Sequence, residues 1–357
     1  MTITQNLWSP VDVGAIRLPH RLAMAPMTRD RSTPGGVPTE LNAEYYAQRV
    51  SAALIITEGT QPSEDGQGYL LTPGIHTEAQ VAGWRRVTDA VHAAGGRIVI
   101  QLMHTGRIAH PVNTPHGRQP VAPSALAPAG QIFTAEGMKE IPEPRALGTD
   151  EVQRTVADFA AAAAAAIRAG ADGVEIHAAN GYLLHQFLSS NANQRGDRYG
   201  GSVENRIRFP VEIAAAVADE IGPERTGLQI SPGNGFNDIV EADTVTLYRA
   251  LVTALAPLGL AYLNIAHQGD ERLLADLRRL WPDALVLNRA GADIERRVQD
   301  IANGIADVVT VGRHVLANPD FVERVRTGAP LNEPDPATFY GGGKRGYTDY
   351  PALTPRA

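Results

Sequence analysis

The stretch 149–178, TDEVQRTVADFAAAAAAAIRAGADGVEIHA, contains the repeating unit that decides the fold. Its first part, Asp150–Ala169, is alanine-rich and therefore has high helix propensity, with Thr149 at the expected N-cap and Gly170 as a stop signal. Its last part, Gly173–Ala178, is a short apolar run of the length expected for a fully buried parallel strand. This alternation of helix and strand is the unit of α/β proteins.

The same unit recurs along the chain. The apolar runs expected as strands are Arg21–Pro26, Ala53–Gly59, Arg97–His104, Gly173–Ala178, Gly227–Pro232, Tyr262–His267, Ala284–Ala290 and Asp307–Arg313. The segments expected as helices are Thr39–Ser51, Glu78–Ala94, Asp150–Ala169, Ser202–Ile221, Ala242–Ala256, Glu271–Leu280, Asp293–Ala302 and His314–Arg326. This order predicts a single-domain (β/α)8 TIM barrel over residues 1–357. An open doubly wound sheet is the weaker alternative, because no glycine fingerprint follows the first strand.

Two segments depart from this rhythm. Residues 105–148, rich in Pro and Gly, form a long insertion after the third strand, for which we expect a lid-like role. Within it, Gln131–Phe133 and Met138–Ile141 predict a hairpin. The tail 329–357 is also rich in Pro and Gly and is expected to be irregular.

Composition excludes several classes of function. The 357 residues carry a net charge of −7, which argues against nucleic acid or a membrane surface as a partner. The absence of cysteine excludes disulfides, iron–sulfur clusters and cysteine nucleophiles. The N-terminal MTITQNLWSP does not resemble a signal peptide, and the alanine run 160–166 is too short to span a bilayer, so we expect a cytoplasmic protein.

Polar side chains collect where the predicted strands end, which is where barrel enzymes place their chemistry. They are Thr28, Glu58, Gln101, His104, His177, Asn180, Gln229, His267, Arg289 and Arg313. Strand ends leave the core in any barrel, so charged residues are expected there anyway. A cluster of amides and imidazoles is less well explained in that way and favours an enzyme.

The last two strands end in glycine-containing segments that suit an anion. Gly291 and Gly312 allow backbone N–H groups to approach a ligand, and Arg313 can bind phosphate with two hydrogen bonds. Each glycine alone is equally consistent with a plain turn. Together they favour a phosphate site, which barrels commonly build from these two loops.

The fourth strand leads into His177, Asn180 and Tyr182. Two hydrogen-bond donors three residues apart can polarise one carbonyl oxygen, and a nearby phenol can act as a general acid. A metal site that joins His177 to His104 or His267 is the alternative, although the carboxylate pairing and spacing of metal hydrolases are lacking.

Several motifs together resemble the Old Yellow Enzyme family of FMN-dependent ene-reductases. They occur in family order and cover almost the whole chain: APMTR at 25–29, TEGT at 57–60, QLMHTGR at 101–107, HAANGYLLHQFLS at 177–189, NQRGDRYGGSVENR at 193–206, VGR at 311–313 and TFYGGG at 338–343. The block 177–206 is the most specific.

The resemblance implies an FMN-containing barrel that takes hydride from NADPH or NADH and delivers it to an activated alkene, such as an enone, enal, maleimide or nitroalkene. By match to the family, the cofactor contacts would come from Pro26, Met27, Thr28, Gly59, Gln101, Gln229, Gly291, Gly312 and Arg313. His177 and Asn180 would bind the substrate carbonyl, and Tyr182 would protonate the α-carbon. Tyr69, Met103 and Tyr340 would line the substrate pocket, and no metal is expected.

Two residues depart from the family pattern. Met103 stands where tryptophan is common, and its flexible thioether should loosen the pocket. Gln229 stands where the family usually has the arginine that stabilises negative charge on the reduced flavin. Arg225 is no substitute, because four strand residues place it about 13 Å away.

Other classes of function remain as alternatives. One is a metal-dependent hydrolase, and another is a non-catalytic flavin-binding sensor, although FMN binding alone does not require His177, Asn180 and Tyr182. The sequence leaves open the physiological substrate, the choice between NADPH and NADH, and whether the protein is a monomer or a homodimer.

Overall fold

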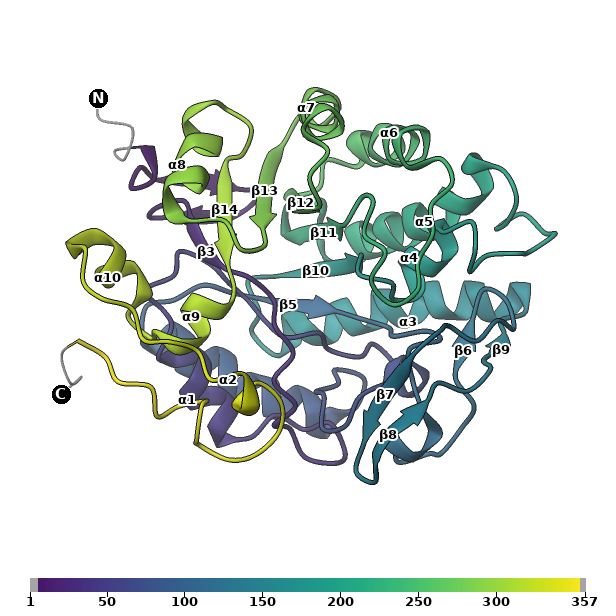
Figure 1. Cartoon of the computed structure of the whole chain (residues 1–357), viewed down its shortest axis with the longest axis horizontal. Coiled ribbons are helices and arrows are strands. Elements are labelled where there is room, and N and C mark those ends of the chain that lie inside the picture. The colour runs from purple at the N-terminus through teal and green to yellow at the C-terminus, as the bar shows by residue number, and fades with distance from the viewer. Residues whose placement is uncertain (1–5, 354–357) are drawn as a thin grey trace.

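The computed structural model describes residues 6–353, and in this range eight parallel strands close into a barrel (Figure 1). The strand order around the barrel is β10-β11-β12-β13-β14-β3-β4-β5. The strands are β3 (Leu22–Met24), β4 (Ile55–Ile56), β5 (Ile98–Leu102), β10 (Gly173–Ala178), β11 (Thr226–Ile230), β12 (Tyr262–His267), β13 (Ala284–Arg289) and β14 (Val308–Val311). The predicted TIM barrel is therefore confirmed.

Helices surround the barrel and bury its outer face (Figure 1). They are α1 (Glu40–Ala47), α2 (Glu78–Ala93), α3 (Thr149–Arg168), α4 (Leu183–Leu188), α5 (Val203–Ile221), α6 (Thr244–Leu255), α7 (Glu271–Leu280), α8 (Ile294–Ala302), α9 (Arg313–Ala317) and α10 (Phe321–Thr327). The alanine run of α3 is largely buried, and its small side chains allow this helix to pack against α5 and β10.

Two details of the predicted helices are wrong. The expected helix His314–Arg326 is broken into α9 and α10, with Asn318 at φ −129° and ψ 93°. Pro319 follows directly, and a proline disfavours helical geometry in the residue before it and lacks its own N–H. The N-cap of α3 is Gly148 rather than Thr149, whose hydroxyl donates to Asp197 at 2.9 Å.

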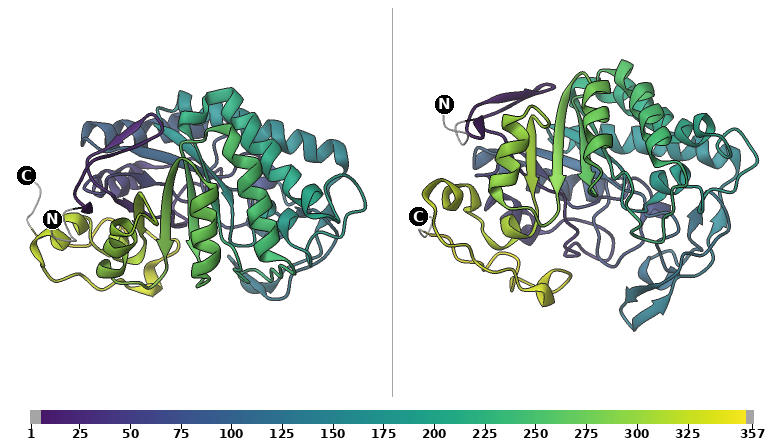
Figure 2. Two further views of the ribbon diagram at one scale, coloured as in Figure 1. Left: turned by 90° about the horizontal axis from the view of Figure 1, so that it is seen from above. Right: turned by 45° about the horizontal axis from the view of Figure 1, so that its top comes forward.

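A short antiparallel hairpin, β1 (Val11–Val13) and β2 (Ile16–Leu18), covers the N-terminal end of the barrel. Its apolar side chains pack against interior residues of the strands, including Val99 and Val286. Gly14 turns the hairpin at φ +55°, where a Cβ atom would lie 2.1 Å from the carbonyl oxygen of Glu224, so only glycine fits. Strands β13 and β14 point away from this hairpin, toward the open end of the barrel (Figure 2).

The insertion after β5 contains the predicted hairpin as β7 (Gln131–Thr134) and β8 (Gly137–Glu140), which projects from the body of the molecule (Figure 2). Two further short strands, β6 (Val121–Ala122) and β9 (Arg145–Ala146), pair at its base. In the C-terminal tail, carbonyl oxygens of Thr338 and Phe339 accept hydrogen bonds from Arg31 and Arg29, each at 2.9 Å. The tail is thus held against the segment that follows β3.

Candidate active site

A cavity of about 210 Å³ lies among the C-terminal ends of the strands. Most of the predicted site residues line it: Pro26, Met27, Thr28, Gly59, Gln101, Met103, His177, Asn180, Tyr182 and Gln229. His267, which the sequence analysis considered as a metal ligand, also lines it. The sequence analysis assigned no site role to the other lining residues, Ala266, Gln268, Asn288 and Ala290. Gly291, Gly312, Arg313, Tyr69 and Tyr340 lie outside this lining. The barrel topology therefore brings together most of the side chains that the motifs singled out.

Amides from β5 and β11, the two strands on either side of β10, form the floor of the cavity. Gln101 on β5 donates through Nε2 to Gln229 on β11 at 3.2 Å and to the buried carboxylate of Glu175 at 2.7 Å. Because both hydrogens of this nitrogen are used, Oε1 of Gln101 and Nε2 of Gln229 remain available as an acceptor and a donor. A flavin pyrimidine edge offers an N–H and carbonyl oxygens, so this floor matches its hydrogen-bonding groups.

Glu175 is a functional candidate that the sequence analysis missed. It precedes His177 by two residues on β10 and therefore shares the strand face that looks into the barrel. Burial raises its pKa to about 7, although hydrogen bonds from Asn264 and Gln101 act in the opposite direction. A carboxylate inside the otherwise apolar run GVEIHA was the available signal.

One wall of the cavity carries a neutral imidazole. His177 Nδ1 accepts the backbone N–H of Ala179 at 3.2 Å, so the ring proton lies on Nε2. Burial lowers the pKa of His177 to about 3, which keeps the ring uncharged at neutral pH. His177 therefore presents a single neutral N–H donor.

Asn180 places a second hydrogen-bond donor beside the N–H group of His177. Its Oδ1 accepts a hydrogen bond from Asn234 at 2.9 Å, which leaves Nδ2 only 3.5 Å from His177 Nε2. Two donors at this separation do not bond to each other. They instead define a position where one acceptor oxygen can receive both N–H groups.

Tyr182 supplies a phenol on the same side of the cavity. Its ring packs edge-on against His177 with centroids 5.1 Å apart, and its hydroxyl lies 3.1 Å from that of Tyr69. Burial raises the pKa of Tyr182 to about 12, while the hydrogen bond from Tyr69 partly opposes this shift. The phenol therefore holds its proton at neutral pH and can act as a proton donor.

The predicted phosphate residues lie beyond the cavity, at the ends of β13 and β14. Gly291 has φ +77°, and Gly312 is the residue directly before α9. The side chain of Arg313 is exposed and has no hydrogen bond or ion pair within residues 6–353. Arg289, in contrast, is held by Asp300 at 2.6 Å and by Glu271 at 2.6 Å. Arg313 is thus free to bind an anion.

At the cavity wall, the backbone of Gly59 lies close to the side chain of Met103. A Cβ atom there would lie 2.4 Å from the sulfur of Met103, so a larger residue would displace that side chain. The absence of a side chain at Gly59, the amide floor and the free Arg313 suit the ring and the phosphate of FMN.

Tyr340 is placed differently from Tyr69 and Tyr182. Its side chain is 66% exposed, and it stacks edge-on with Phe339 in the tail. Tyr69 instead packs with Met103 and Tyr182 in one apolar cluster.

His104 and His267, the histidines considered as metal ligands together with His177, each interact with a different partner. His104 is buried and accepts the N–H of Gly106 through Nδ1 at 3.1 Å, while His267 Nε2 lies 3.1 Å from Glu271. Within the described part of the chain, no group of three His, Asp or Glu side chains is arranged to hold a metal ion.

Across the same residues, no helix is long and apolar enough to cross a membrane.

Comparisons with known proteins agree with this arrangement. Residues 6–332 match the model of the NADH:flavin oxidoreductase / NADH oxidase family. A probable flavin mononucleotide-dependent alkene reductase of Leishmania infantum is 43% identical over 96% of both chains. A putative 12-oxophytodienoate reductase 4 of Oryza sativa subsp. japonica is 40% identical and covers 97% of this chain and 93% of its own.

Solved structures show the same fold. Morphinone reductase in complex with tetrahydroNAD superposes with a TM-score of 0.94 at 45% identity, covering 98% of both chains. The Old Yellow Enzyme homologue from Zymomonas mobilis gives a TM-score of 0.95 at 40% identity, covering 98% of this chain and all of that one. The chain therefore belongs to the NADH:flavin oxidoreductase / NADH oxidase family, the FMN-dependent reductases of the Old Yellow Enzyme type.

Proposed function

We propose that this enzyme reduces activated carbon–carbon double bonds in enones, enals, maleimides or nitroalkenes. Bound FMN supplies the hydride chemistry, with NADPH or NADH as the donor and the β-carbon of the alkene as the final acceptor. The observation that carries the proposal is the pair of neutral donors, His177 Nε2 and Asn180 Nδ2, 3.5 Å apart in the cavity. Neutral donors suit the oxygen of a carbonyl or nitro group.

The two donors polarise the substrate. Hydrogen bonds to the carbonyl oxygen withdraw electrons from the conjugated double bond and stabilise the negative charge that forms on that oxygen. The β-carbon then accepts hydride more readily. Because the rings of His177 and Tyr182 are packed together, the same arrangement holds the phenol near the reacting atoms.

Tyr182 completes the reaction. We propose that it transfers its proton to the α-carbon, since its raised pKa keeps it protonated at neutral pH. Tyr69 holds the hydroxyl through the 3.1 Å hydrogen bond, and a proton from water replaces the one that Tyr182 gives up.

We assign the remaining residues to cofactor and substrate binding. Pro26, Met27, Thr28, Gly59, Gln101 and Gln229 would surround the flavin ring, and Gly291, Gly312 and Arg313 would hold its phosphate. Met103, Tyr69 and Tyr340 would contact substrate. Residues 105–148 would cover the mouth of this single-domain barrel as a lid.

The test is an anaerobic experiment on the holoenzyme in two stages. NADPH or NADH should bleach the flavin absorption, and addition of cyclohex-2-enone, a maleimide or a nitroalkene should restore it with one equivalent of saturated product. Flavin that is reduced but is not reoxidised by any of these alkenes would instead favour a non-catalytic flavin-binding protein.

A further inference from the structure

The loop 231–237, which follows β11, makes three separate contacts with Asn180. Ser231 Oγ accepts the backbone N–H of Asn180 at 2.9 Å, and Asn237 donates to its backbone carbonyl at 2.8 Å. Asn234 donates to its side-chain oxygen at 2.9 Å. Asn180 itself has φ +54°, a conformation that few residues other than glycine adopt, and the loop contacts hold it there.

The direction of these hydrogen bonds fixes which end of the Asn180 amide faces the cavity. A side-chain amide has one accepting and one donating end, and its orientation follows from its partners. The backbone N–H of Phe236 donates to Asn234 Oδ1 at 3.0 Å, so Asn234 must present its NH2 group to Asn180. Asn180 therefore accepts with its oxygen and turns its own NH2 group toward His177.

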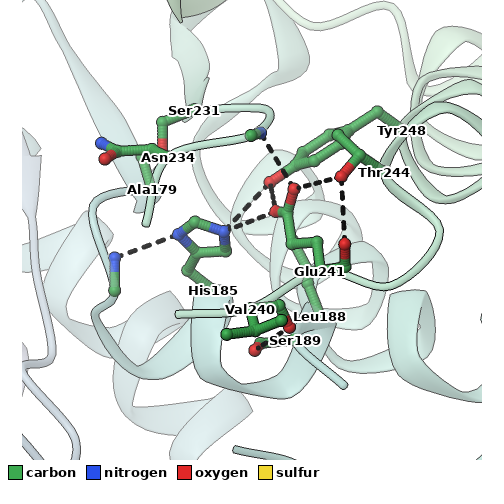
Figure 3. Close-up of polar contacts among 12 residues, drawn as sticks. Ala179, His185, Leu188, Ser189, Ser231, Asn234, Val240, Glu241, Thr244 and Tyr248 are labelled. Carbon is green, nitrogen blue, oxygen red and sulfur yellow. Dashed lines mark hydrogen bonds and ion pairs between the residues drawn. The ribbon is translucent and has the colours of Figure 1, made fainter. Parts of the chain in front are cut away.

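The loop is anchored from behind by a buried carboxylate. Glu241 Oε2 accepts the N–H of Gly233 at 2.9 Å, directly before Asn234, and Glu241 Oε1 lies 2.7 Å from His185 Nε2 (Figure 3). Tyr248 donates to the same carboxylate at 2.6 Å. His185 Nδ1 in turn accepts the N–H of Gly181, so the carboxylate ties the loop to the turn that carries Asn180.

We infer that Asn234 is a positioning residue that sets the polarity of the Asn180 amide, so that an N–H rather than an oxygen faces the substrate oxygen. The consequence for substrate binding rests on the proposed function, whereas the amide orientation does not. If the side-chain amide of Asn180 were reversed, its oxygen would face the substrate carbonyl oxygen, and these two acceptors would repel each other.

Asn234→Asp tests this inference because it changes polarity with little change in shape. An ionised aspartate accepts the N–H of Phe236 but cannot donate to Asn180, so Asn180 should turn its NH2 group toward the carboxylate. At pH 8 the Kd for cyclohex-2-enone, followed by flavin absorption of the oxidised holoenzyme, should rise about tenfold, equivalent to about 1.4 kcal/mol. Protonated aspartate can donate again, so the affinity should recover toward the wild-type value near pH 4.

At each pH, the Kd of the Asn234→Asp variant is divided by the Kd of the wild type, and the pH dependence of this ratio is the result of interest. The titratable and charged groups that surround the loop and the turn are His177, Tyr182, His185, Glu241, Asp238 and Arg107. They are present in both proteins, so their own titration cancels in the ratio. A ratio that does not change with pH would contradict the inference.

Two further variants separate positioning from general loosening of the loop. In an Asn180→Ala background, Asn234→Asp should have no further effect on the Kd, as expected when one residue acts only through the other. Asn191→Asp is the matched control: Asn191 anchors the segment that directly follows the loop, through Asp238 and Val240, but does not contact Asn180. It should leave the Kd near the wild-type value. An equal loss of affinity with or without Asn180 would overturn the inference.

A readout without substrate keeps the inference testable if the proposed function fails. The side-chain NH2 signal of Asn180, identified by its loss in Asn180→Ala, should shift in the NMR spectrum of Asn234→Asp and return as the pH falls. An unchanged signal would refute the orienting role. A shifted signal in a protein whose wild type binds no enone would instead refute the proposed function and leave the orienting role standing.

Discussion

The phenol of Tyr182 is protonated at neutral pH, and its neighbours fix the direction in which its hydroxyl group points. The raised pKa of about 12 keeps the proton in place, and Tyr69 and His177 restrict the position of the hydroxyl group and the ring. Tyr182→Phe should therefore slow reoxidation of the reduced enzyme by cyclohex-2-enone by ~10²–10⁴-fold, the usual effect of removing a positioned acid. Stopped-flow absorption measures this rate.

Two comparisons control the Tyr182→Phe experiment. Reduction by NADH and reoxidation by oxygen transfer no proton to carbon, so both should stay near their wild-type rates. Enone reoxidation that is as fast as in the wild type would show that another group supplies the proton.

Gln229, which departs from the family pattern, has a neutral amide rather than a charged group as its hydrogen-bond partner. Where the family usually has arginine, this chain has an amide that accepts from Gln101, and the nearby Glu175 receives its hydrogen bonds from amides. Within residues 6–353, the cavity lining contains no lysine or arginine. A glutamine can satisfy a flavin oxygen with a hydrogen bond but cannot supply the positive charge.

The sequence predicted which side chains meet in the cavity better than it predicted the residues that orient them. His177, Asn180 and Tyr182 lie close together in the sequence at the end of one strand, so their spacing alone indicated a shared site. Asn234 acts on Asn180 across two loops, and no local pattern marks a contact between residues 54 positions apart. Glu175 was overlooked because its strand was recognised only as an apolar run.

At the scale of elements, all eight barrel strands were predicted, whereas the hairpin β1–β2 was not. Long apolar runs between amphipathic segments identify buried strands, whereas β1 and β2 have three residues each and carry little periodic signal. The break between α9 and α10 was missed because the apolar pattern continues through Pro319. Proline overrides such a pattern by removing a backbone donor.

The segments after β13 and β14 lead to a prediction about cofactor retention. Arg313 is exposed at the start of α9 and has no partner within the described residues, so its loss should leave the fold unchanged while removing a cation from the proposed phosphate site. Arg313→Ala should weaken FMN binding at least tenfold, measured by fluorescence of released flavin. Arg272→Ala, an exposed arginine on α7, removes the same charge elsewhere and should retain FMN. Equal FMN affinity in both variants would contradict the phosphate assignment.

At the scale of the whole molecule, the barrel is closed at one end and open at the other. The hairpin β1–β2 covers the N-terminal end, whereas the cavity is lined by residues at the C-terminal ends of the strands. Under the proposed function, the nicotinamide and the alkene would use this same cavity in turn. The first product would then leave before the second substrate binds.

The central claim is that hydride reaches the β-carbon through the flavin while the α-carbon receives a proton. Isotope labelling tests it most directly. Reduction of 2-methylcyclohex-2-enone with NADH deuterated at the transferred position should place deuterium only on the β-carbon, and unlabelled NADH in D₂O should place it on the α-carbon. Mass spectrometry and NMR of the product locate the label. Deuterium from the nicotinamide on the α-carbon, or unreacted enone beside fully reduced flavin, would contradict the account.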